Sequence, residues 1–402
     1  MSLLDLLPRD EIWVEYLDYK TSRRLLNPRE EARLRDYIAN GRYRSIAQGV
    51  CAGDYRFSTP VKHLVNKSSG GEKRVVYTFS EDETMLLKLL SYLLYRYDGC
   101  FSPNCYAFRK NTGAKKALSR FVRCEAIRSL YGYKADIKTY FPRLPSGRLL
   151  PMLRQMLGDD RLYALFVDLL GNDRALYEGC LLHEQKGVMA GTPTSPFLAN
   201  LYLRDLDRYF FENDVLYARY SDDLLLFGSE EAVRIHRETI RCFLEEAGLQ
   251  INPQKEAFFA PHEPWDFLGF QFADGAVDLS PVAKRKIKAK IKRKANKLRR
   301  WKLKKNADDQ RVLCAMNRIF NHKFFAVDSG RELSWARWFF PVLTTENGLR
   351  EIDRYMQETQ RYLVTGKYNK TNYQKVPYAL LQACGYRPLV AAYYDYRKSR
   401  SL

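Results

Sequence analysis

The stretch Leu216-Tyr-Ala-Arg-Tyr-Ser-Asp-Asp-Leu-Leu-Leu-Phe227 decides the fold of this chain. Apolar, strand-forming runs flank Ser221-Asp222-Asp223, a pattern typical of a β-hairpin with the acids at its tip. Two carboxylates in tandem repel each other unless a cation compensates them, and an exposed turn lets both reach the same divalent ion. A lone Asp-Asp pair is more often a solvated turn. The strongly apolar flanks favour a metal site here.

A third acid, Asp136, stands between Ala135 and Ile137 at the end of a second predicted strand. Three carboxylates from two adjacent strands could hold two Mg²⁺ ions about 3.5–4 Å apart, the arrangement used for in-line phosphoryl transfer. Mg²⁺ is expected because carboxylate and phosphate oxygens are hard ligands, and Mn²⁺ is the alternative ion. The predicted metal site therefore consists of Asp136, Ile137, Asp222 and Asp223, and the three aspartates are predicted to be catalytic.

Composition limits the class of partner. The 402 residues include 67 Lys and Arg against 47 Asp and Glu, which gives a net charge of +20. This balance favours a polyanion such as RNA, DNA or an acidic membrane surface, although a merely soluble basic protein stays open. No run of about eighteen apolar residues predicts a membrane span, and the first residues do not resemble a signal peptide. The eight cysteines form no C-x-x-C pair, so neither zinc nor a disulfide framework is indicated, and a cytoplasmic location is expected.

Local patterns outline the remaining elements. Residues 1–65 contain short helical patterns, such as Pro28 to Ile38. The segment from Lys67 to Lys73 reads as a flexible turn, the next six residues as a strand, and residues 83–97 as an amphipathic helix. Between Ala283 and Lys305 stand fourteen Lys or Arg residues and no acid. Apolar residues recur there at helical spacing, which predicts a cationic helix suited to a nucleic-acid backbone.

Six sequence strings, taken in order, resemble bacterial reverse transcriptases of the group II intron and retron lineage. They are Phe101-Ser-Pro-Asn-Cys-Tyr-Ala-Phe-Arg109, Ala135-Asp-Ile-Lys-Thr-Tyr-Phe141, Gly187-Val-Met-Ala-Gly-Thr-Pro-Thr-Ser-Pro-Phe-Leu-Ala-Asn200, Tyr220-Ser-Asp-Asp223, Gly248-Leu-Gln-Ile-Asn-Pro-Gln-Lys255 and Phe267-Leu-Gly-Phe270. The resemblance covers about residues 70 to 280. Any one string could arise by chance, but six in the family's order are a specific signal.

The resemblance implies an α/β (α+β) right-hand polymerase fold. Fingers, a palm with an antiparallel sheet flanked by helices, and a helical thumb would follow an N-terminal helical extension. The expected divisions are the extension at 1–65, fingers at 66–132, palm at 133–280 with an interposed fingers/palm segment at 150–205, and a basic helical thumb with the C-terminal region at 281–402. The implied activity is that of an RNA-directed DNA polymerase.

The resemblance also implies roles for single residues. Phe141 matches the steric gate that selects deoxynucleotides, and Lys255 matches a lysine proposed to protonate the leaving pyrophosphate. On residue type alone, Phe141 would be a core aromatic and each of the cations would be a solvated surface side chain. The expected nucleotide-binding residues are Lys73, Arg74, Arg109, Phe141, Ala190 and Gly191; the expected primer grip is Phe267, Leu268 and Gly269; and the expected nucleic-acid contacts of the cationic helix are Lys284, Lys288, Lys292 and Arg299.

Two departures from the family pattern bear on what is polymerised. Met189-Ala190 stands where the family has Pro-Gln, so a side chain that usually contacts the incoming nucleotide is replaced by a methyl group. Pro142 stands where an acid or a small polar residue is common. Both departures leave untemplated synthesis open beside templated synthesis. The Val-Thr-Gly tripeptide of retrons occurs here only at Val364-Thr-Gly366, far from the catalytic box.

The biological expectation is a standalone defence-associated reverse transcriptase acting against phage. Its partners would be a structured non-coding RNA as template and scaffold, deoxynucleoside triphosphates as substrates and cDNA as product, with no membrane partner. The alternatives are a maturase of the group II intron type, a retron-like enzyme, and a catalytically inactive RNA-binding scaffold. The priming mechanism and the oligomeric state are left open.

Overall fold

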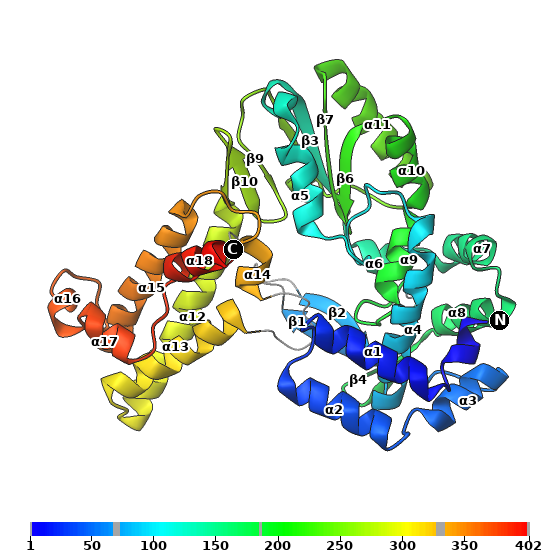
Figure 1. The fold of residues 1–402 in the computed structure, drawn as a ribbon, viewed down its shortest axis with the longest axis horizontal. Helices are drawn as coiled ribbons and strands as arrows, with labels where there is room; N and C mark the ends of the chain where they lie inside the picture. The colour runs from blue at the N-terminus through cyan, green and yellow to red at the C-terminus, as the bar shows by residue number, and fades with distance from the viewer. Residues whose placement is uncertain (1, 67–72, 185–186, 327–333, 400–402) are drawn as a thin grey trace. The chain divides into compact units, whose positions relative to one another are not determined.

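The structure is a computed structural model that describes residues 2–66, 73–184, 187–326 and 334–399. The chain divides into two compact units: residues 1–23 with 28–263, and residues 24–27 with 264–402. Figure 1 shows both units as ribbons. Most of the turn predicted between Lys67 and Lys73 lies outside the described residues.

The first unit begins with helices, as the sequence predicts. They are η1 (Leu3–Leu6), α1 (Asp10–Ser22), α2 (Pro28–Ala39) and α3 (Arg44–Ala52). A buried aromatic cluster joins them: the Trp13 ring stacks on Tyr43 at a centroid distance of 4.6 Å, and its indole N–H donates to the Leu7 carbonyl at 2.8 Å. Strand β1 (Val61–Asn66) starts within the range 1–65 expected for the helical extension.

A four-stranded sheet follows, in the order β2-β1-β4-β5. It consists of β1 with β2 (Lys73–Thr78), β4 (Arg174–Tyr177) and β5 (Cys180–His183), and its neighbours run antiparallel except for the β1–β4 pair. Helix α4 (Glu81–Leu93) starts at a capping box in which Ser80 and Glu83 satisfy each other's backbone N–H groups. With the 3₁₀ turn η2 (Leu94–Cys100), α4 confirms the helix predicted at 83–97.

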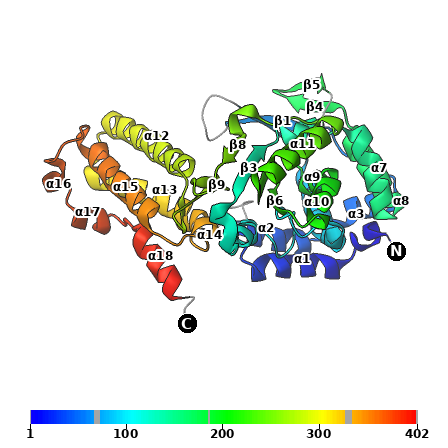
Figure 2. The same cartoon turned by 90° about the horizontal axis from the view of Figure 1, so that it is seen from above.

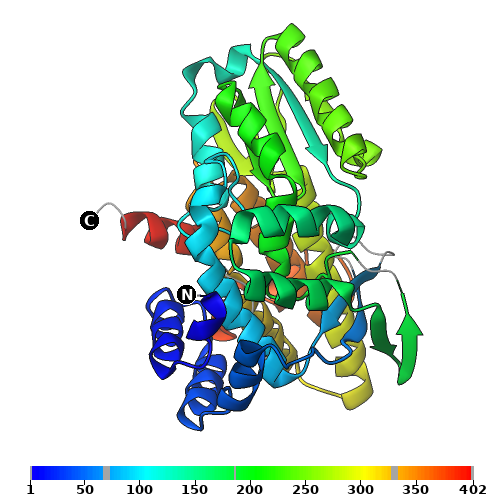
Figure 3. The same cartoon turned by 90° about the vertical axis from the view of Figure 1, so that its right-hand side faces the viewer.

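The second sheet of this unit is built around the stretch quoted first. Its order is β6-β7-β3-β8, all antiparallel, with β6 (Leu216–Tyr220), β7 (Asp223–Gly228), β3 (Tyr131–Asp136) and β8 (Ala257–Phe259). Helix α11 runs along β3 and β7, as Figure 3 shows. The other helical elements of the first unit are α5 (Ala114–Val122), η3 (Glu125–Ser129), α6 (Tyr140–Arg143), α7 (Ser146–Leu157), α8 (Asp160–Gly171), α9 (Ser195–Tyr202), α10 (Arg204–Glu212), α11 (Glu230–Glu246) and η4 (Pro253–Lys255).

The second unit joins a three-stranded antiparallel sheet, in the order β11-β10-β9, to a group of helices. Its elements are β9 (Trp265–Phe267), β10 (Phe270–Ala273), β11 (Ala276–Leu279), α12 (Pro281–Lys305), α13 (Asp309–Phe325), α14 (Trp335–Phe339), α15 (Asn347–Thr365), α16 (Asn372–Lys375), α17 (Tyr378–Ala383) and α18 (Leu389–Lys398). Figure 2 shows α12, α13 and α15 side by side. The predicted apolar seam is confirmed at Ile287, Ile291 and Ala295 of α12, which are buried, whereas Leu298 and Trp301 farther along the predicted seam are half-buried.

These elements confirm the predicted fold class, a mixture of helices with antiparallel sheets. The four predicted divisions stay a prediction. The boundary between the two compact units lies between residues 263 and 264, so the strands β9 to β11 belong with the helices that follow them. One bond that joins them is the Val277 N–H of β11, which donates to the Thr344 hydroxyl at 2.7 Å. Among the described helices, none combines the length and the apolar character needed to cross a bilayer.

Gly132 tests the packing of the β6-β7-β3-β8 sheet. A Cβ at this position would lie 2.5 Å from Cε1 of Phe227, the residue directly opposite in β7. We expect Gly132→Ala to lower the free energy of unfolding by about 1–3 kcal/mol, measured by urea denaturation. Gly171→Ala is the matched control, because a Cβ there meets nothing within 4 Å at the end of α8; a loss as large at Gly171 would contradict the packing explanation.

Candidate functional site

The two predicted strands bring the three aspartates together. Asp136, the last residue of β3, lies directly opposite Asp223, the first residue of β7. Because directly opposite residues in a ladder point to the same face of a sheet, both side chains leave the same face. Tyr220 pairs with Asp223, so Ser221 and Asp222 form a two-residue turn. The predicted hairpin with acids at its tip is confirmed.

The backbone around these acids is tied down by hydrogen bonds. The Ile137 N–H donates to the Asp222 carbonyl at 3.0 Å, and the Asn252 N–H donates to the Asp136 carbonyl at 2.7 Å. The Ile137 side chain is buried and contains no donor atom, so only its carbonyl oxygen could serve in the predicted metal site. These bonds hold the backbone from which the carboxylates extend.

Burial and mutual repulsion act on the acids. Burial, followed by the charges of Asp222 and Asp136, raises the pKa of Asp223 to about 7. Burial, followed by the charge of Asp136, also raises the pKa of Asp222 above its ordinary value. Negative charge in this cluster is costly without a cation, which is the electrostatic condition that favours divalent metal binding.

Lys255 supplies one positive charge. Its ammonium lies 2.7 Å from Oδ2 of Asp136, although the lysine side chain is 57% exposed. Partial burial alone would lower the pKa of Lys255, but the hydrogen bond to Asp136 and the charges of the three aspartates outweigh it and raise the pKa. Lys255 is thus a protonated, accessible group beside the acids, as its predicted role as a proton donor requires.

The residues fit a divalent cation by their chemistry, since the donor set is three carboxylates and the charge of Asp136 helps to raise the pKa of both Asp222 and Asp223. Within the described ranges, however, no three His, Cys, Asp or Glu side chains are gathered closely enough to enclose an ion. Asp136 is instead bonded to Lys255. Metal binding at these acids therefore stays a prediction, and we expect the Asp136 side chain to leave Lys255 when an ion binds.

The predicted nucleotide-binding residues Ala190 and Gly191 lie against strand β2, which carries Lys73 and Arg74 at its start. The Tyr77 N–H donates to the Ala190 carbonyl at 2.8 Å. Gly191 has φ 102°, and a Cβ there would lie 2.8 Å from the Tyr77 carbonyl oxygen. Glycine is needed at this point for close approach to a strand, and the expected contact of Gly191 with a nucleotide stays a prediction. Lys73 and Arg74 are exposed, and their contact with a triphosphate stays a prediction.

Arg109 is bonded within its own loop. Its guanidinium donates to the carbonyls of Ser102 at 2.7 Å, Cys105 at 3.0 Å and Asp98 at 2.8 Å. These bonds hold the segment Phe101–Arg109 in a fixed conformation. The predicted contact of Arg109 with phosphate is not tested by this arrangement and stays a prediction.

Phe141, the predicted steric gate, lies at the start of the short helix α6, five residues after Asp136. Its ring meets the ring of Phe108 at a centroid distance of 6.3 Å and an interplanar angle of 71°. Phe108 has φ 59°, a conformation that is rare for a bulky residue, and its side chain is 37% exposed. The sequence does not predict this ring contact, because residue type alone does not signal the positive φ of Phe108.

The predicted primer grip belongs to the second unit. Phe267 ends β9, and Leu268 and Gly269, both with positive φ, form the turn into β10. The Trp338 indole N–H donates to the Leu268 carbonyl at 3.2 Å, and the Ser280 N–H donates to the Gly269 carbonyl at 2.8 Å. The turn is thus bonded to helix α14 and to the start of α12. Its role as a primer grip stays a prediction.

Helix α12 uses part of its charge internally. Lys284 and Lys288 form ion pairs with Glu351 of α15 at 2.8 and 2.5 Å, and Arg299 lies over the Tyr362 ring at 5.8 Å. Lys292 is exposed. Three of the four cations predicted to bind nucleic acid therefore also hold α12 against α15. The exposed cations of the helix that sequence reasoning did not select are Arg285, Lys286, Arg293, Lys297, Arg300, Lys304 and Lys305.

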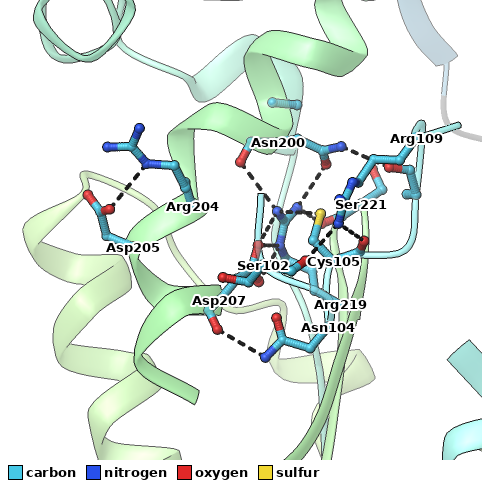
Figure 4. A network of polar contacts seen from close by, with 12 residues as sticks. Ser102, Asn104, Cys105, Arg109, Asn200, Arg204, Asp205, Asp207, Arg219 and Ser221 are labelled. Carbon is cyan, nitrogen blue, oxygen red and sulfur yellow. Dashed lines mark hydrogen bonds and ion pairs between the residues drawn. The ribbon is translucent and has the colours of Figure 1, made fainter. Parts of the chain in front are cut away.

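Sequence reasoning also missed the buried arginine next to the hairpin tip. Arg219 is fully buried and lies 2.5 Å from the carboxylate of Asp207, which is also buried (Figure 4). A signal was available, since Arg219 is the one charged residue of the run Leu216–Tyr220 that becomes β6. An arginine in an apolar strand requires a buried partner.

Comparison with known proteins places the aspartates within a matched region. A family model described as reverse transcriptase (RNA-dependent DNA polymerase) matches residues 65–272. The "Uncharacterized 91 kDa protein in cob intron" of Schizosaccharomyces pombe is 27% identical over 168 residues, 42% of this chain and 20% of that protein. The "Retron Mx65 reverse transcriptase" of Myxococcus xanthus is 26% identical over 206 residues, 48% of this chain and 47% of that protein. The chain thus spans a fifth and about half of these relatives' lengths.

Two solved telomerase structures are more distant matches. Apo telomerase from Candida tropicalis, truncated from its C-terminal domain, gives a TM-score of 0.45 at 14% identity and covers 56% of this chain and 55% of that one. Telomerase from Candida albicans, in complex with a TWJ fragment of telomeric RNA, gives a TM-score of 0.44 at 12% identity and covers 87% of this chain and 66% of that one.

The raised pKa of Asp223 predicts a pH-dependent stability. The folded state holds this proton more tightly than the unfolded chain, so stability falls as pH rises from the ordinary carboxyl pKa of 3.8 to about 7. We expect Asp223→Asn, measured in EDTA, to be more stable than the wild type by about 2 kcal/mol at pH 8 and to match it near pH 4. The exposed Glu245→Gln serves as control. An Asp223→Asn variant that is no more stable than the wild type at pH 8 would refute the claim that ionised Asp223 destabilises the folded state.

Proposed function

The chain belongs to the reverse transcriptase (RNA-dependent DNA polymerase) family, and we propose that it copies RNA into DNA at a site formed by Asp136, Asp222 and Asp223. The observation that carries this proposal is the register in which Asp136 lies opposite Asp223, with Asp222 in the adjoining turn. The raised pKa values of Asp222 and Asp223 support it, because they indicate a cluster that favours a cation.

The chemistry proposed for the site is nucleotidyl transfer. Divalent metal ions, when bound by the three carboxylates, would activate a primer 3′-hydroxyl and neutralise the charge that develops on the pyrophosphate. Lys255 donates a proton to the leaving pyrophosphate, since its ammonium is protonated and exposed beside the acids. Phe141 limits the space at the sugar and so selects deoxynucleotides. Lys73 and Arg74, exposed at the start of β2, offset phosphate charge.

The proposed partners follow from this activity. Deoxynucleoside triphosphates are the substrates, RNA is the template and cDNA is the product. The exposed cations of α12, including Lys292, are proposed to contact the nucleic-acid backbone, which agrees with the net charge of +20. Similarity to a protein named as a retron reverse transcriptase supports this partner class.

A finer proposal concerns the biological context. We propose that the template is a cognate structured non-coding RNA and that the cDNA serves antiphage defence in the cytoplasm. An intron-type maturase and a retron-like enzyme are the competing assignments, since one relative is named for an intron and the other for a retron. Sequencing the RNA that copurifies with the protein separates them: intron RNA supports the maturase, and a short dedicated RNA supports the defence proposal.

The catalytic proposal is tested by removing the hairpin acids. Wild-type protein with an RNA template, a DNA primer, Mg²⁺ and deoxynucleotides should extend the primer, and the double variant Asp222→Ala with Asp223→Ala should lose at least about 10³-fold of this activity, because the ligands for both metal ions are removed. The tandem acids Glu245 and Glu246, exposed on α11, give a matched double-alanine control that should stay within twofold of wild type, taking about 0.5 kcal/mol as the usual limit for surface changes.

Primer extension that persists in the Asp222→Ala, Asp223→Ala protein would contradict the assignment of the site. A wild type that binds RNA but incorporates no nucleotide would instead support the inactive scaffold. RNA affinity, measured by filter binding at several salt concentrations, should fall steeply with salt under either assignment. Nucleotide incorporation is therefore the measurement that decides between them.

The steric gate is tested by substrate choice. Phe141→Val should raise the use of ribonucleotides relative to deoxynucleotides by at least about tenfold, because a smaller side chain leaves room for the 2′-hydroxyl. Competition between the two triphosphate types in primer extension measures the ratio. Phe211→Val, on an aromatic side chain of α10 that is 46% exposed, is the control and should leave the ratio unchanged; an unchanged ratio in Phe141→Val would remove the gate from the proposal.

A further inference from the structure

The catalytic hairpin rests on a buried ionic network that Figure 4 shows from close by. Arg219 on β6 and Asp207 on α10 are both fully buried. The guanidinium makes three contacts with the carboxylate: Nε to Oδ1 at 2.9 Å, Nε to Oδ2 at 3.1 Å and Nη2 to Oδ2 at 2.5 Å. Such a pair is fixed in direction, because a planar guanidinium and a planar carboxylate match in few orientations.

The remaining donors of Arg219 reach segments far apart in the chain. Nη1 donates to Oδ1 of Asn200 at 3.3 Å, and Nη2 donates to the sulfur of Cys105 at 3.1 Å. The backbone continues the link, since the Arg219 N–H donates to the Asn104 carbonyl and the Tyr106 N–H donates to the Arg219 carbonyl, both at 2.9 Å. Arg219 thus joins three of the motif segments: the one ending at Arg109, the one ending at Asn200 and its own hairpin.

One contact bears on the acids directly. Nη1 of Arg219 also donates to the main-chain carbonyl of Ser221 at 3.1 Å. Ser221 has φ 62°, a left-handed conformation that disfavours residues with a Cβ, and it immediately precedes Asp222. A strained residue keeps such a conformation only where its surroundings hold it, and here the guanidinium is the side-chain group bonded to the Ser221 carbonyl, beside the backbone bond from the Ile137 N–H to the Asp222 carbonyl.

A purely structural pair does not account for this arrangement. A buried ion pair contributes little to stability compared with apolar side chains of similar volume, so packing alone gives no reason for it. The contact with the Ser221 carbonyl, by contrast, sets the turn from which the Asp222 and Asp223 side chains extend. An apolar replacement would fill the space and leave that carbonyl unbound.

We propose that Arg219, oriented by Asp207, is a positioning residue that fixes the left-handed turn at Ser221 and thereby places Asp222 and Asp223 to bind divalent metal. The inference rests on the proposed function, since it concerns the same acids. Arg219 touches neither metal nor substrate in this role. Loss of Arg219 should weaken metal binding because the turn at Ser221 would no longer be held in its left-handed conformation. A residue at position 221 that adopts positive φ without strain should make Arg219 unnecessary for metal binding.

The test measures Mn²⁺ binding by electron paramagnetic resonance, with no nucleotide present, beside the Mg²⁺ dependence of primer extension. Arg219→Lys keeps the charge but loses the forked donors. It should weaken Mn²⁺ binding at least tenfold and raise the half-saturating Mg²⁺ concentration by a similar factor. Tyr217→Phe removes the hydroxyl that donates to Asp207 at 3.1 Å and keeps Arg219 in place, so Mn²⁺ affinity should stay within twofold of wild type.

A rescue separates positioning from general stability. Glycine accepts positive φ without strain, so Ser221→Gly added to Arg219→Lys should recover at least threefold of the lost Mn²⁺ affinity. Asp207→Glu, which keeps the ion pair but displaces the guanidinium, gives a second variant if Arg219→Lys does not fold, and the same rescue should apply. Folded Arg219→Lys or Asp207→Glu protein with Mn²⁺ affinity within twofold of wild type, or a double variant without recovery, would overturn the proposal.

The two proposals fail separately. A wild type that binds Mn²⁺ in an Arg219-dependent manner but extends no primer would refute the polymerase function and leave the positioning role intact. A wild type that extends primers, with Arg219→Lys equal to it in metal dependence, would refute the positioning role and leave the function intact. A wild type that binds no Mn²⁺ and extends no primer would refute both.

Discussion

The constraint on which the rest of this structure depends is the placement of like charges on one face of one sheet. Asp136 and Asp223 are direct partners in the β3–β7 ladder, and Asp222 occupies the adjoining turn. Burial, followed by repulsion from the charges of Asp222 and Asp136, raises the pKa of Asp223 to about 7. Lys255 relieves part of this repulsion through Asp136. The described site is therefore a cluster whose charge is only partly compensated, a state that a divalent cation would complete.

Specific contacts in the surrounding structure hold the acids in this arrangement. The absence of a side chain at Gly132 leaves room for the Phe227 ring of the neighbouring strand. The absence of a side chain at Gly191 lets its own backbone lie close to strand β2. Arg219 bonds the hairpin turn to segments around residues 104 and 200. In each case a residue type that would be unfavourable elsewhere, a glycine in a strand or turn or a buried arginine, permits a close approach or a buried bond. Precision at the acids thus derives from several distant parts of the first unit.

Much of this could be predicted from the sequence, where the signal is local. Apolar runs around Asp222 predict the hairpin, and the spacing of Ile287, Ile291 and Ala295 predicts the buried seam of α12. Contacts between distant segments could not be predicted, because one sequence does not record them. The sequence therefore does not identify Glu351 as the partner of Lys284 and Lys288, the loop carbonyls as the partners of Arg109, or Asp207 as the buried partner that Arg219 requires. The family resemblance supplied the roles of Phe141 and Lys255, which residue type alone would have assigned to a core and a surface.

The central claim is that Asp136, Asp222 and Asp223 bind divalent metal during nucleotide addition. Anomalous scattering from Mn²⁺ tests it most directly, in a crystal of the protein with an RNA template, a DNA primer terminated at its 3′ end and a deoxynucleoside triphosphate. We expect Mn²⁺ peaks within coordination distance of oxygens of Asp136, Asp222 and Asp223, with the Lys255 ammonium moved away from Asp136. A bound triphosphate with no Mn²⁺ peak at these carboxylates, and Lys255 still paired with Asp136, would contradict it.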